Sequence, residues 1–240
     1  MRTYKYTEET ISTNNDIKNE IYSSDEPCYT VLRAEKQNGG RGRLGRSFFS
    51  PSGGLYFSIS LPISRNNDNI PVITLLSGLA ASKAVDDLCD VKTQIKWPND
   101  IYLNGKKLGG ILCELVSGKV LTVVIGIGIN IGVMAEDIPE ELKSKMTSVV
   151  IENGKIPSLD DLMRKITEYI DEMTAGTNVL HYIEEMNRKS YLTGQRVIYS
   201  VDGKEREGIF TDIAPDGAAV IINNEGGRDE VRFGEVKMKC

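Results

Sequence analysis

The stretch from residue 91 to residue 130 restricts the fold more than any other part of the 240-residue chain. It contains four strand-like runs, VKTQIKW, DIYL, KKLGGILCELV and KVLTVVIGIGIN. Asn104-Gly105 separates DIYL from KKLGGILCELV, and this dipeptide favours the type I′ turn that joins two antiparallel strands. We therefore predict an antiparallel meander in the middle of the chain.

Helices and further strands are predicted on both sides of this meander. Ile17 and Ile21 lie four residues apart, as in a short helix, and Ser158 followed by Asp161 is a typical helix start. The predicted elements are helices at 13–24, 70–89, from 158 onward and at 179–189, and strands at 27–37 and 53–63.

After about Tyr191 the sequence changes to short strand-like runs separated by glycine-containing turns. The short runs RVIYS, GIFTDIA, AAVIIN and DEVRFGEV are separated by DG, PDG and NEGG turns, as in a small β-barrel of about 45 residues. We predict one domain at 1–190 and a second at 191–240.

Composition limits the function classes. The chain is 40% hydrophobic with a net charge of −5, and no run approaches the ~20 apolar residues of a membrane span. The N-terminus lacks the apolar core of a signal peptide, so a cytoplasmic location is expected. Four scattered cysteines without C-x-x-C spacing suggest neither a zinc site nor a disulfide framework. His181 is the single histidine, which disfavours a Ser-His-Asp mechanism and suggests a structural role.

The segment GGRGRLGRSF at residues 39–48 places three arginines on flexible backbone. The planar guanidinium groups of Arg41, Arg43 and Arg46 suit carboxylate and phosphate oxygens. A solvated basic loop is the simpler interpretation. The segment is short, however, and Phe48-Phe49 ties it to a core between two predicted strands. This context favours a loop that closes over an anionic ligand.

Two other segments gather polar groups at strand ends. In KWPNDIYLNGKKLGGIL, residues 96–112, Asn99 and Asp100 begin a strand, Lys107 follows the hairpin turn, and Gly109-Gly110 indicates a bulge or a close approach of a ligand. In VVIGIGINIG, residues 123–132, glycines alternate before Asn130, without the spacing of a phosphate-binding P-loop or a dinucleotide site.

The segments GRGRLGR, KWPNDIYLNGKKLGGIL and GIGIN, in this order, closely resemble the biotin protein ligases, also called biotin–[acetyl-CoA-carboxylase] ligases. STN at 12–14, MTSV at 146–149 and the β-rich tail fit the same family. The resemblance implies an α+β fold of the class II synthetase type, with a mixed, largely antiparallel sheet, helices and a small C-terminal SH3-like β-barrel. It also implies a short form, without the N-terminal DNA-binding domain of the regulatory members.

The resemblance implies a two-step reaction with ATP, biotin and Mg²⁺. The biotin carboxylate attacks the α-phosphate of ATP, and a lysine of a biotin carboxyl carrier protein then attacks the biotinyl-5′-AMP. Family members of this form are often homodimers, and no membrane or nucleic-acid partner is expected.

The resemblance also implies site roles. Lys107 matches the family's catalytic lysine, and Arg41 and Arg43 match arginines that close over the adenylate. The implied biotin-binding residues are Ser12, Thr13, Asn14, Gln37, Gly40, Arg41, Lys107 and Gly110. The implied nucleotide-binding residues are Arg43, Arg46, Phe48 (where the family usually has tryptophan), Trp97, Asn99 and Asn130, with Asp100 a metal candidate.

Three alternatives remain at this level. A lipoate or octanoate ligase would need an apolar tunnel, which Ser12-Thr13-Asn14 argues against. A nucleic-acid-binding module would use the arginine loop and the barrel, against the net negative charge. A biotin-binding protein without activity would not need Lys107.

Overall fold

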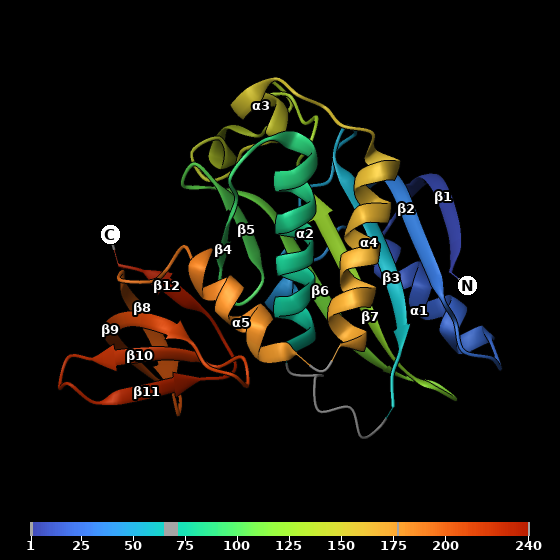
Figure 1. Ribbon diagram of the computed structural model, residues 1–240. Helices are drawn as coiled ribbons and strands as arrows, with labels where there is room; N and C mark the ends of the chain where they lie inside the picture. The colour runs from blue at the N-terminus through green and yellow to red at the C-terminus, as the bar shows by residue number, and fades with distance from the viewer. Residues whose placement is uncertain (1, 65–71, 177, 240) are drawn as a thin grey trace.

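A seven-stranded sheet forms the larger part of the computed structural model, which describes residues 2–64, 72–176 and 178–239 (Figure 1). Its strands lie in the order β1-β2-β3-β7-β6-β5-β4. β1 pairs with β2 in parallel, and every other neighbouring pair in this sheet is antiparallel. The strands are β1 (Thr3–Thr10), β2 (Thr30–Gln37), β3 (Leu55–Pro62), β4 (Gln94–Lys96), β5 (Asp100–Leu103), β6 (Lys106–Ser117) and β7 (Leu121–Ile129).

The predicted meander is confirmed, because β4, β5, β6 and β7 pair antiparallel in sequence order. At the turn between β5 and β6, Asn104 has φ 48° and Gly105 has φ 78°. Positive φ at both central residues is what a type I′ turn requires. Successive side chains of a strand point to opposite faces, so every second residue of β6 and β7 points into the core.

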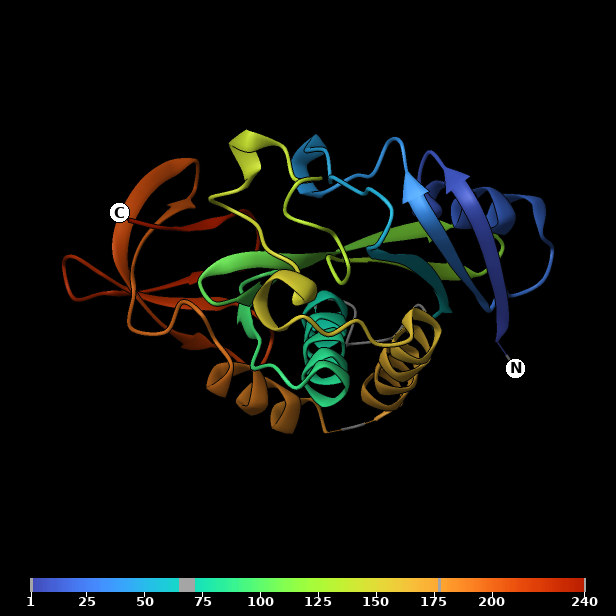
Figure 2. The ribbon, with the colours of Figure 1, turned by 90° about the horizontal axis from the view of Figure 1, so that it is seen from above.

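Helices cover the two faces of this sheet unequally. α2 (Ile73–Cys89) and α4 (Leu159–Ala175) lie side by side on one face, and α1 (Thr13–Ser23) lies on the other, as Figure 2 shows. α3 (Val149–Asn153) follows the long loop after β7, and α5 (Val179–Arg188) leads to the second sheet. The helix start at Ser158 is confirmed, since its hydroxyl accepts a hydrogen bond from Asp161 N at 3.2 Å.

A second, five-stranded sheet holds the C-terminal residues in the order β11-β10-β9-β8-β12. Its strands are β8 (Arg196–Val201), β9 (Lys204–Ile213), β10 (Ala219–Asn223), β11 (Arg228–Val231) and β12 (Val236–Met238). Buried side chains of this sheet, among them Tyr199 and Phe210, belong to the same apolar cluster as Leu76 of α2 and Trp97, which follows β4. The two sheets therefore share a continuous core.

Three elements differ from the prediction, and one of them is the short helix α3, for which no helix was predicted. β1 was not predicted, because its sequence TYKYTEET is polar and its side chains are mostly exposed at the sheet edge. DEVRFGEV was predicted as one strand, but it forms β11 and β12 with a break at Arg232–Glu235. Among the described residues no helix is long and apolar enough to cross a membrane.

Candidate functional site

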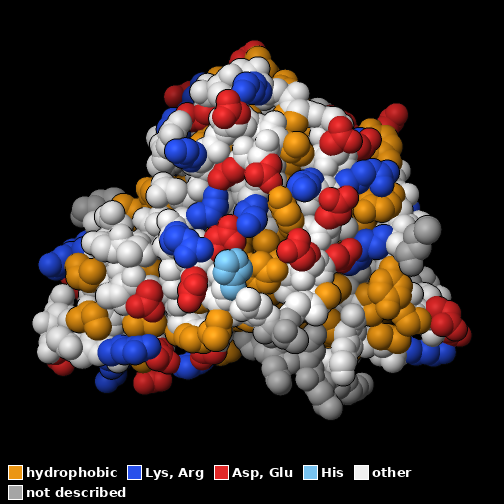
Figure 3. Space-filling model, viewed as in Figure 1, with side chains coloured by type: hydrophobic (Ala, Val, Ile, Leu, Met, Phe, Trp, Pro, Cys, Tyr) orange, Lys and Arg blue, Asp and Glu red, His pale blue; other side chains and the backbone are white. Residues whose placement is uncertain are grey.

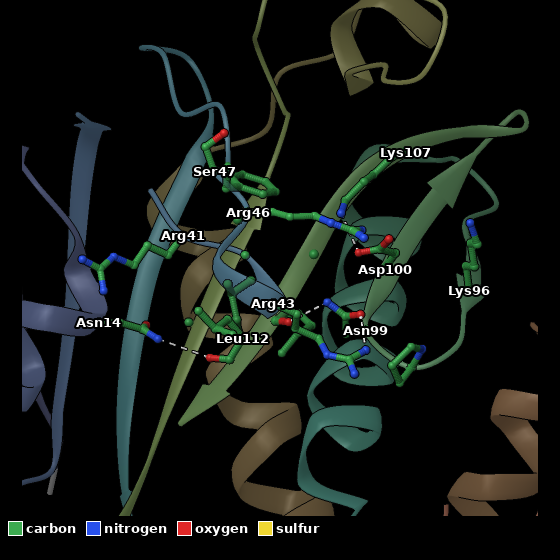
Figure 4. A pocket seen from close by; sticks show the side chains of 18 of the residues that line it. Asn14, Arg41, Arg43, Arg46, Ser47, Lys96, Asn99, Asp100, Lys107 and Leu112 are labelled. Atoms are coloured by element: carbon green, nitrogen blue, oxygen red, sulfur yellow. Dashed lines mark hydrogen bonds and ion pairs between the residues drawn. The ribbon is translucent and has the colours of Figure 1, made fainter. Parts of the chain in front are cut away.

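A pocket opens over the ends of β5, β6 and β7, between the arginine loop and the C-terminal sheet (Figure 4). Most of the residues singled out in the sequence lie in its wall: Ser12, Thr13, Asn14, Gln37, Arg41, Arg43, Arg46, Phe48, Trp97, Asn99, Asp100, Lys107 and Gly110. They come from segments spread over about a hundred residues of sequence. The fold therefore brings the three motifs together.

Lys107 and Asp100 face each other across the β5–β6 hairpin. Lys107 Nζ forms an ion pair with Asp100 Oδ1 at 2.6 Å. The strand register shifts here, since Ile101 pairs with Gly109 while Tyr102 pairs with Lys107, which leaves Leu108 as the extra residue of a β-bulge. A bulge re-aims side chains, and this one confirms the expectation drawn from Gly109-Gly110. The ammonium group of Lys107 thus lies in the pocket beside a single carboxylate.

The arginine loop crosses the mouth of the pocket between β2 and β3. Arg43 donates to Asn99 Oδ1 at 3.2 Å and to the carbonyl oxygen of Gly234 at 2.8 Å. Arg46 pairs with Glu235, so two of the three arginines are tied to the segment before β12. Burial lowers the pKa of Arg43, but a guanidinium group stays protonated at neutral pH.

Arg41 points to a different part of the pocket. Figure 4 shows its guanidinium group on the side of Asn14, across the pocket from Lys107. Its charge contributes to keeping the pKa of Glu114 low. The three guanidinium groups therefore do not form one cluster: two lie near Lys107 and Asn99, and one lies near the amide of Asn14.

A buried polar cluster forms the wall that α1 and β2 contribute. Gln37 Oε1 accepts from Thr13 N at 3.0 Å, and Gln37 Nε2 donates to Ser50 Oγ at 3.2 Å. Asn14 Nδ2 donates to the carbonyl oxygen of Leu112 at 3.3 Å and to Glu114 Oε2 at 2.7 Å. These contacts set the orientation of both amide groups. The pocket thus has Lys107, Arg43 and Arg46 at one side, and at the other it has neutral hydrogen-bonding groups with Arg41 beside them.

Glycines of β7 make room for this cluster and for Phe48. A Cβ atom on Gly126 would lie 2.2 Å from Asn14 Oδ1, and one on Gly128 would lie 2.6 Å from Phe48 Cε1. The segment GIGIN therefore supplies no phosphate loop. Its glycines let side chains of α1 and of the arginine loop approach the sheet.

Gly40 and Asn130 are not part of the pocket wall. Gly40 lies directly behind it, where a Cβ would be 2.5 Å from the carbonyl oxygen of Phe48. Asn130 is buried, and its Nδ2 donates to the carbonyl oxygen of Thr147 at 3.0 Å. The amide of Asn130 thus holds the segment before α3, instead of projecting into the pocket as the resemblance suggested.

Trp97 lies in the wall with most of its ring buried. Its Nε1 donates to the carbonyl oxygen of Gly217 at 3.0 Å, which links the pocket to the C-terminal sheet. His181 lies on the exposed surface of α5, away from the pocket, and is visible in Figure 3. Its ring makes an edge-to-face contact with the ring of Tyr182.

The C-terminal residues contribute to the pocket in a way that was not predicted from the sequence. Glu235, Val236 and Lys237 line it, although no residue of the tail stood out in the sequence. The tripeptide GEV at 234–236 carries no motif that would indicate a place in the pocket wall. Only the packing of the two sheets brings it to the pocket. The described residues contain no cluster of three or more His, Cys, Asp or Glu side chains that could hold a metal ion.

Comparisons with known proteins agree with this geometry. The sequence profile of the biotin/lipoate A/B protein ligase family matches residues 6–130, more than half of the chain. The bifunctional ligase/repressor BirA of Bacillus spizizenii is 36% identical over 177 residues, which cover 70% of this chain and 54% of that protein. The chain thus spans about half the length of that relative. The biotin–[acetyl-CoA-carboxylase] ligase of Mycobacterium tuberculosis is 29% identical over 232 residues, covering 93% of this chain and 84% of that protein.

A solved structure matches nearly the whole fold. The biotin protein ligase of Aquifex aeolicus, in complex with biotin and ATP, superposes with a TM-score of 0.82 at 27% sequence identity. The match covers 99% of this chain and 98% of that one, so it includes the C-terminal sheet.

Proposed function

This chain belongs to the biotin/lipoate A/B protein ligase family, and from that premise we propose that it is a biotin protein ligase. It activates biotin with ATP and transfers it to a lysine of a biotin carboxyl carrier protein. The observation that carries the proposal is the arrangement of the pocket: Lys107 and Arg43 at one side and a neutral amide–hydroxyl cluster around Asn14 at the other. The first side suits a carboxylate and a phosphate, and the second suits a polar, uncharged ring.

The reaction needs no nucleophile from the protein. An oxygen of the biotin carboxylate attacks the α-phosphorus of ATP, the bond to the β-phosphate oxygen breaks, and pyrophosphate leaves with biotinyl-5′-AMP as product. The unprotonated ε-amine of the carrier lysine then attacks the acyl carbon. The amide bond forms, AMP leaves with the C–O bond electrons, and the amine loses a proton.

The residues at the charged side act by position and charge. Lys107 neutralises the biotin carboxylate and the α-phosphate as they approach, which places two anions in contact and stabilises the charge that shifts between them. Arg43 holds the nucleotide part of the adenylate from the loop, and Arg41 of the same loop faces the biotinyl part from the Asn14 side. Closure of this loop over the mixed anhydride keeps water from it.

The neutral side binds biotin. Thr13, Asn14 and Gln37 have hydroxyl and amide groups in the wall, which match the N–H and C=O groups of the ureido ring. Ser12, another buried polar residue of the wall, adds to this side, and Gly110 gives room beside Lys107. Gly40 acts indirectly, by allowing Phe48 to lie close behind the loop.

Arg46, Phe48, Trp97 and Asn99 form the nucleotide side of the pocket. Mg²⁺ brought in with ATP would supply positive charge to the phosphate oxygens, and it would be held mainly by those oxygens and water, with Asp100 as the candidate protein ligand. The pocket fits an ion held in this way, because Asp100 already pairs with Lys107 and leaves few carboxylates for a protein cage. Asn130 supports the site from behind, through Thr147.

Further parts of the proposal concern organisation. We assign the catalytic domain to residues 1–190 and an SH3-like domain to 191–240, supported by the separate five-stranded sheet. We expect a homodimer, as the resemblance suggests, and an assembly of twice 26.5 kDa in light scattering would agree with it. The reduced, buried thiols of Cys28 and Cys89 favour a cytoplasmic location.

The proposal is tested by mass spectrometry of the protein incubated with ATP, Mg²⁺ and equal amounts of biotin, lipoate and octanoate. Biotinyl-AMP should form on the unmodified protein and fall about 100-fold or more in Lys107→Ala, since one charge-stabilising group is lost. Lys106→Ala is the matched control, because Lys106 Nζ contacts only the carbonyl oxygen of Lys143 in the described contacts. A lipoyl or octanoyl adenylate in place of biotinyl-AMP would contradict the assignment of biotin as the substrate and would support the adenylation reaction.

A further inference from the structure

Behind the pocket wall, Ser58 of β3 joins the two side chains of the neutral cluster. Its Oγ lies 2.6 Å from Asn14 Oδ1 and 2.7 Å from Thr13 Oγ1. The side chain is fully buried and does not line the pocket. Ser58 can therefore act on a ligand only through its neighbours.

Two acceptors, the carbonyl oxygen of Leu112 and the carboxylate of Glu114, determine the orientation of the Asn14 amide. Burial opposes ionisation of Glu114 most strongly, yet the hydrogen bonds from Lys18 and Asn14 together with the nearby positive charges keep its pKa low. The resulting carboxylate only accepts hydrogen bonds, so the group that faces it at 2.7 Å must be the Nδ2 of Asn14. Consequently the oxygen of the amide faces Ser58.

The hydroxyl protons then have one consistent direction. Asn14 Oδ1 cannot donate, so Ser58 gives its single proton to it. The 2.7 Å contact between Ser58 and Thr13 must then use the proton of Thr13. The alternative acceptor for Thr13, Gln37 Oε1, lies farther away at 3.2 Å and already accepts from Thr13 N.

This chain of hydrogen bonds leaves a defined set of free groups for a ligand. Thr13 Oγ1 and Asn14 Oδ1 each keep acceptor capacity, and Gln37 Nε2 keeps one hydrogen beside the one that Ser50 accepts. Two acceptors and one donor complement a cyclic urea, which has two N–H groups and one C=O group. A ligand that lacks these groups would leave the buried polar atoms unpaired, at a cost in affinity.

We propose that Ser58 is a positioning residue for substrate specificity: it holds Thr13 and Asn14 as hydrogen-bond acceptors for the ureido N–H groups of biotin. This inference rests on the proposed function and deepens it. Ser58 has no part in the nucleotide side of the pocket, so its effect should be confined to biotin.

The test compares Ser58→Ala with Ser60→Ala by isothermal titration calorimetry with biotin and, separately, with ATP. Ser60 is the matched control, because it is also fully buried on β3 and makes two hydrogen bonds of 2.7 Å, to Thr30 N and Cys28 O, away from the pocket. We expect Ser58→Ala to raise the biotin Kd about tenfold and to leave the ATP Kd within twofold. Ser60→Ala should leave both Kd values unchanged, and Ser58→Thr, which retains the hydroxyl, should recover most of the biotin affinity.

Several results would overturn the proposal. An unchanged biotin Kd in folded Ser58→Ala would do so, and so would an equal loss for biotin and ATP, since that is the sign of a merely structural role. Unmodified protein that binds ATP but forms no biotinyl-AMP would instead overturn the proposed function and remove the basis of this inference with it. Urea unfolding of both alanine variants completes the experiment by reporting the stability that each buried hydroxyl contributes.

Discussion

Arg46, in the loop between β2 and β3, donates from Nη2 to Glu235 Oε2 at 2.8 Å, although 189 residues separate the two along the chain. Arg43 adds a hydrogen bond to the neighbouring Gly234 carbonyl oxygen. The C-terminal sheet therefore holds the loop that covers the pocket. In a biotin protein ligase this arrangement would couple the position of the C-terminal sheet to the protection of the adenylate.

Glu235→Gln tests this coupling. The amide keeps the shape of the carboxylate but removes the charge that faces Arg46, so the loop should become less ordered without ligand. We expect the KM for ATP to rise about three- to tenfold and free biotinyl-AMP to leak into solution faster, with the unfolding midpoint nearly unchanged because the pair is partly exposed. Glu225→Gln, at an exposed turn of the same sheet, is the control. Equal kinetics in both variants would contradict the coupling.

Trp97→Phe tests the second link between the sheets. The phenyl ring fills most of the same buried volume but cannot donate to the carbonyl oxygen of Gly217, which Trp97 Nε1 reaches at 3.0 Å. An unsatisfied buried acceptor should lower the free energy of unfolding by about 1–3 kcal/mol in a urea titration. Hydrogen exchange of the 214–218 turn should also become faster. Wild-type stability would show that water replaces the indole donor.

Glu114 should make biotin binding independent of pH over the neutral range. The fold lowers the pKa of Glu114, so the carboxylate is fully ionised above its ordinary value of 4.5. The stabilisation that the ionised group gives is lost only as pH falls through the lower folded-state value. We therefore expect that Glu114 causes no change in the biotin Kd between about pH 6 and pH 8. Glu114→Gln should raise the Kd several-fold across that range, because a neutral side chain replaces the charge-assisted acceptor of Asn14 Nδ2 and leaves the longer contact to the carbonyl oxygen of Leu112 to orient the amide.

The control for this variant is Glu20→Gln. Glu20 also pairs with a lysine, Lys5, and accepts from Thr30, but it lies outside the pocket. Its substitution should leave the biotin Kd unchanged. A Kd that rose in both variants would indicate a general loss of packing around α1 instead of a specific effect on Asn14.

Gly128→Ala should displace Phe48. A Cβ at this position would lie 2.6 Å from the edge of the ring, closer than carbon atoms approach in proteins, so the ring must move. We expect the KM for ATP to rise about tenfold or more, together with a lower unfolding midpoint. Gly78→Ala is the contrasting control: its Cβ would meet Ile111 at 3.9 Å, and alanine in the middle of α2 should stabilise the chain by up to about 1 kcal/mol. If Gly128→Ala retains wild-type kinetics, Phe48 has no role in nucleotide binding.

The sequence by itself indicated most of the local elements and most of the residues that line the pocket. Asn104-Gly105 defined the hairpin because few residues other than asparagine and glycine adopt positive φ at both turn positions, and alternating apolar residues defined β6 and β7. The arginine loop and Lys107 stood out by their charge and context, whereas Thr13, Asn14 and Gln37 were indicated only by the resemblance to the biotin protein ligases.

Only the tertiary structure decided which polar groups face a ligand and which support it. Asn130, expected at the nucleotide, turns inward to Thr147, whereas Glu235 comes to the pocket from the far end of the chain. β1 and Ser58 had no signal in the sequence, because an edge strand needs no apolar face and one serine among several carries no mark of its partners. Contacts between residues distant in sequence depend on the packing of the sheets and helices, and that packing is not encoded in any single motif.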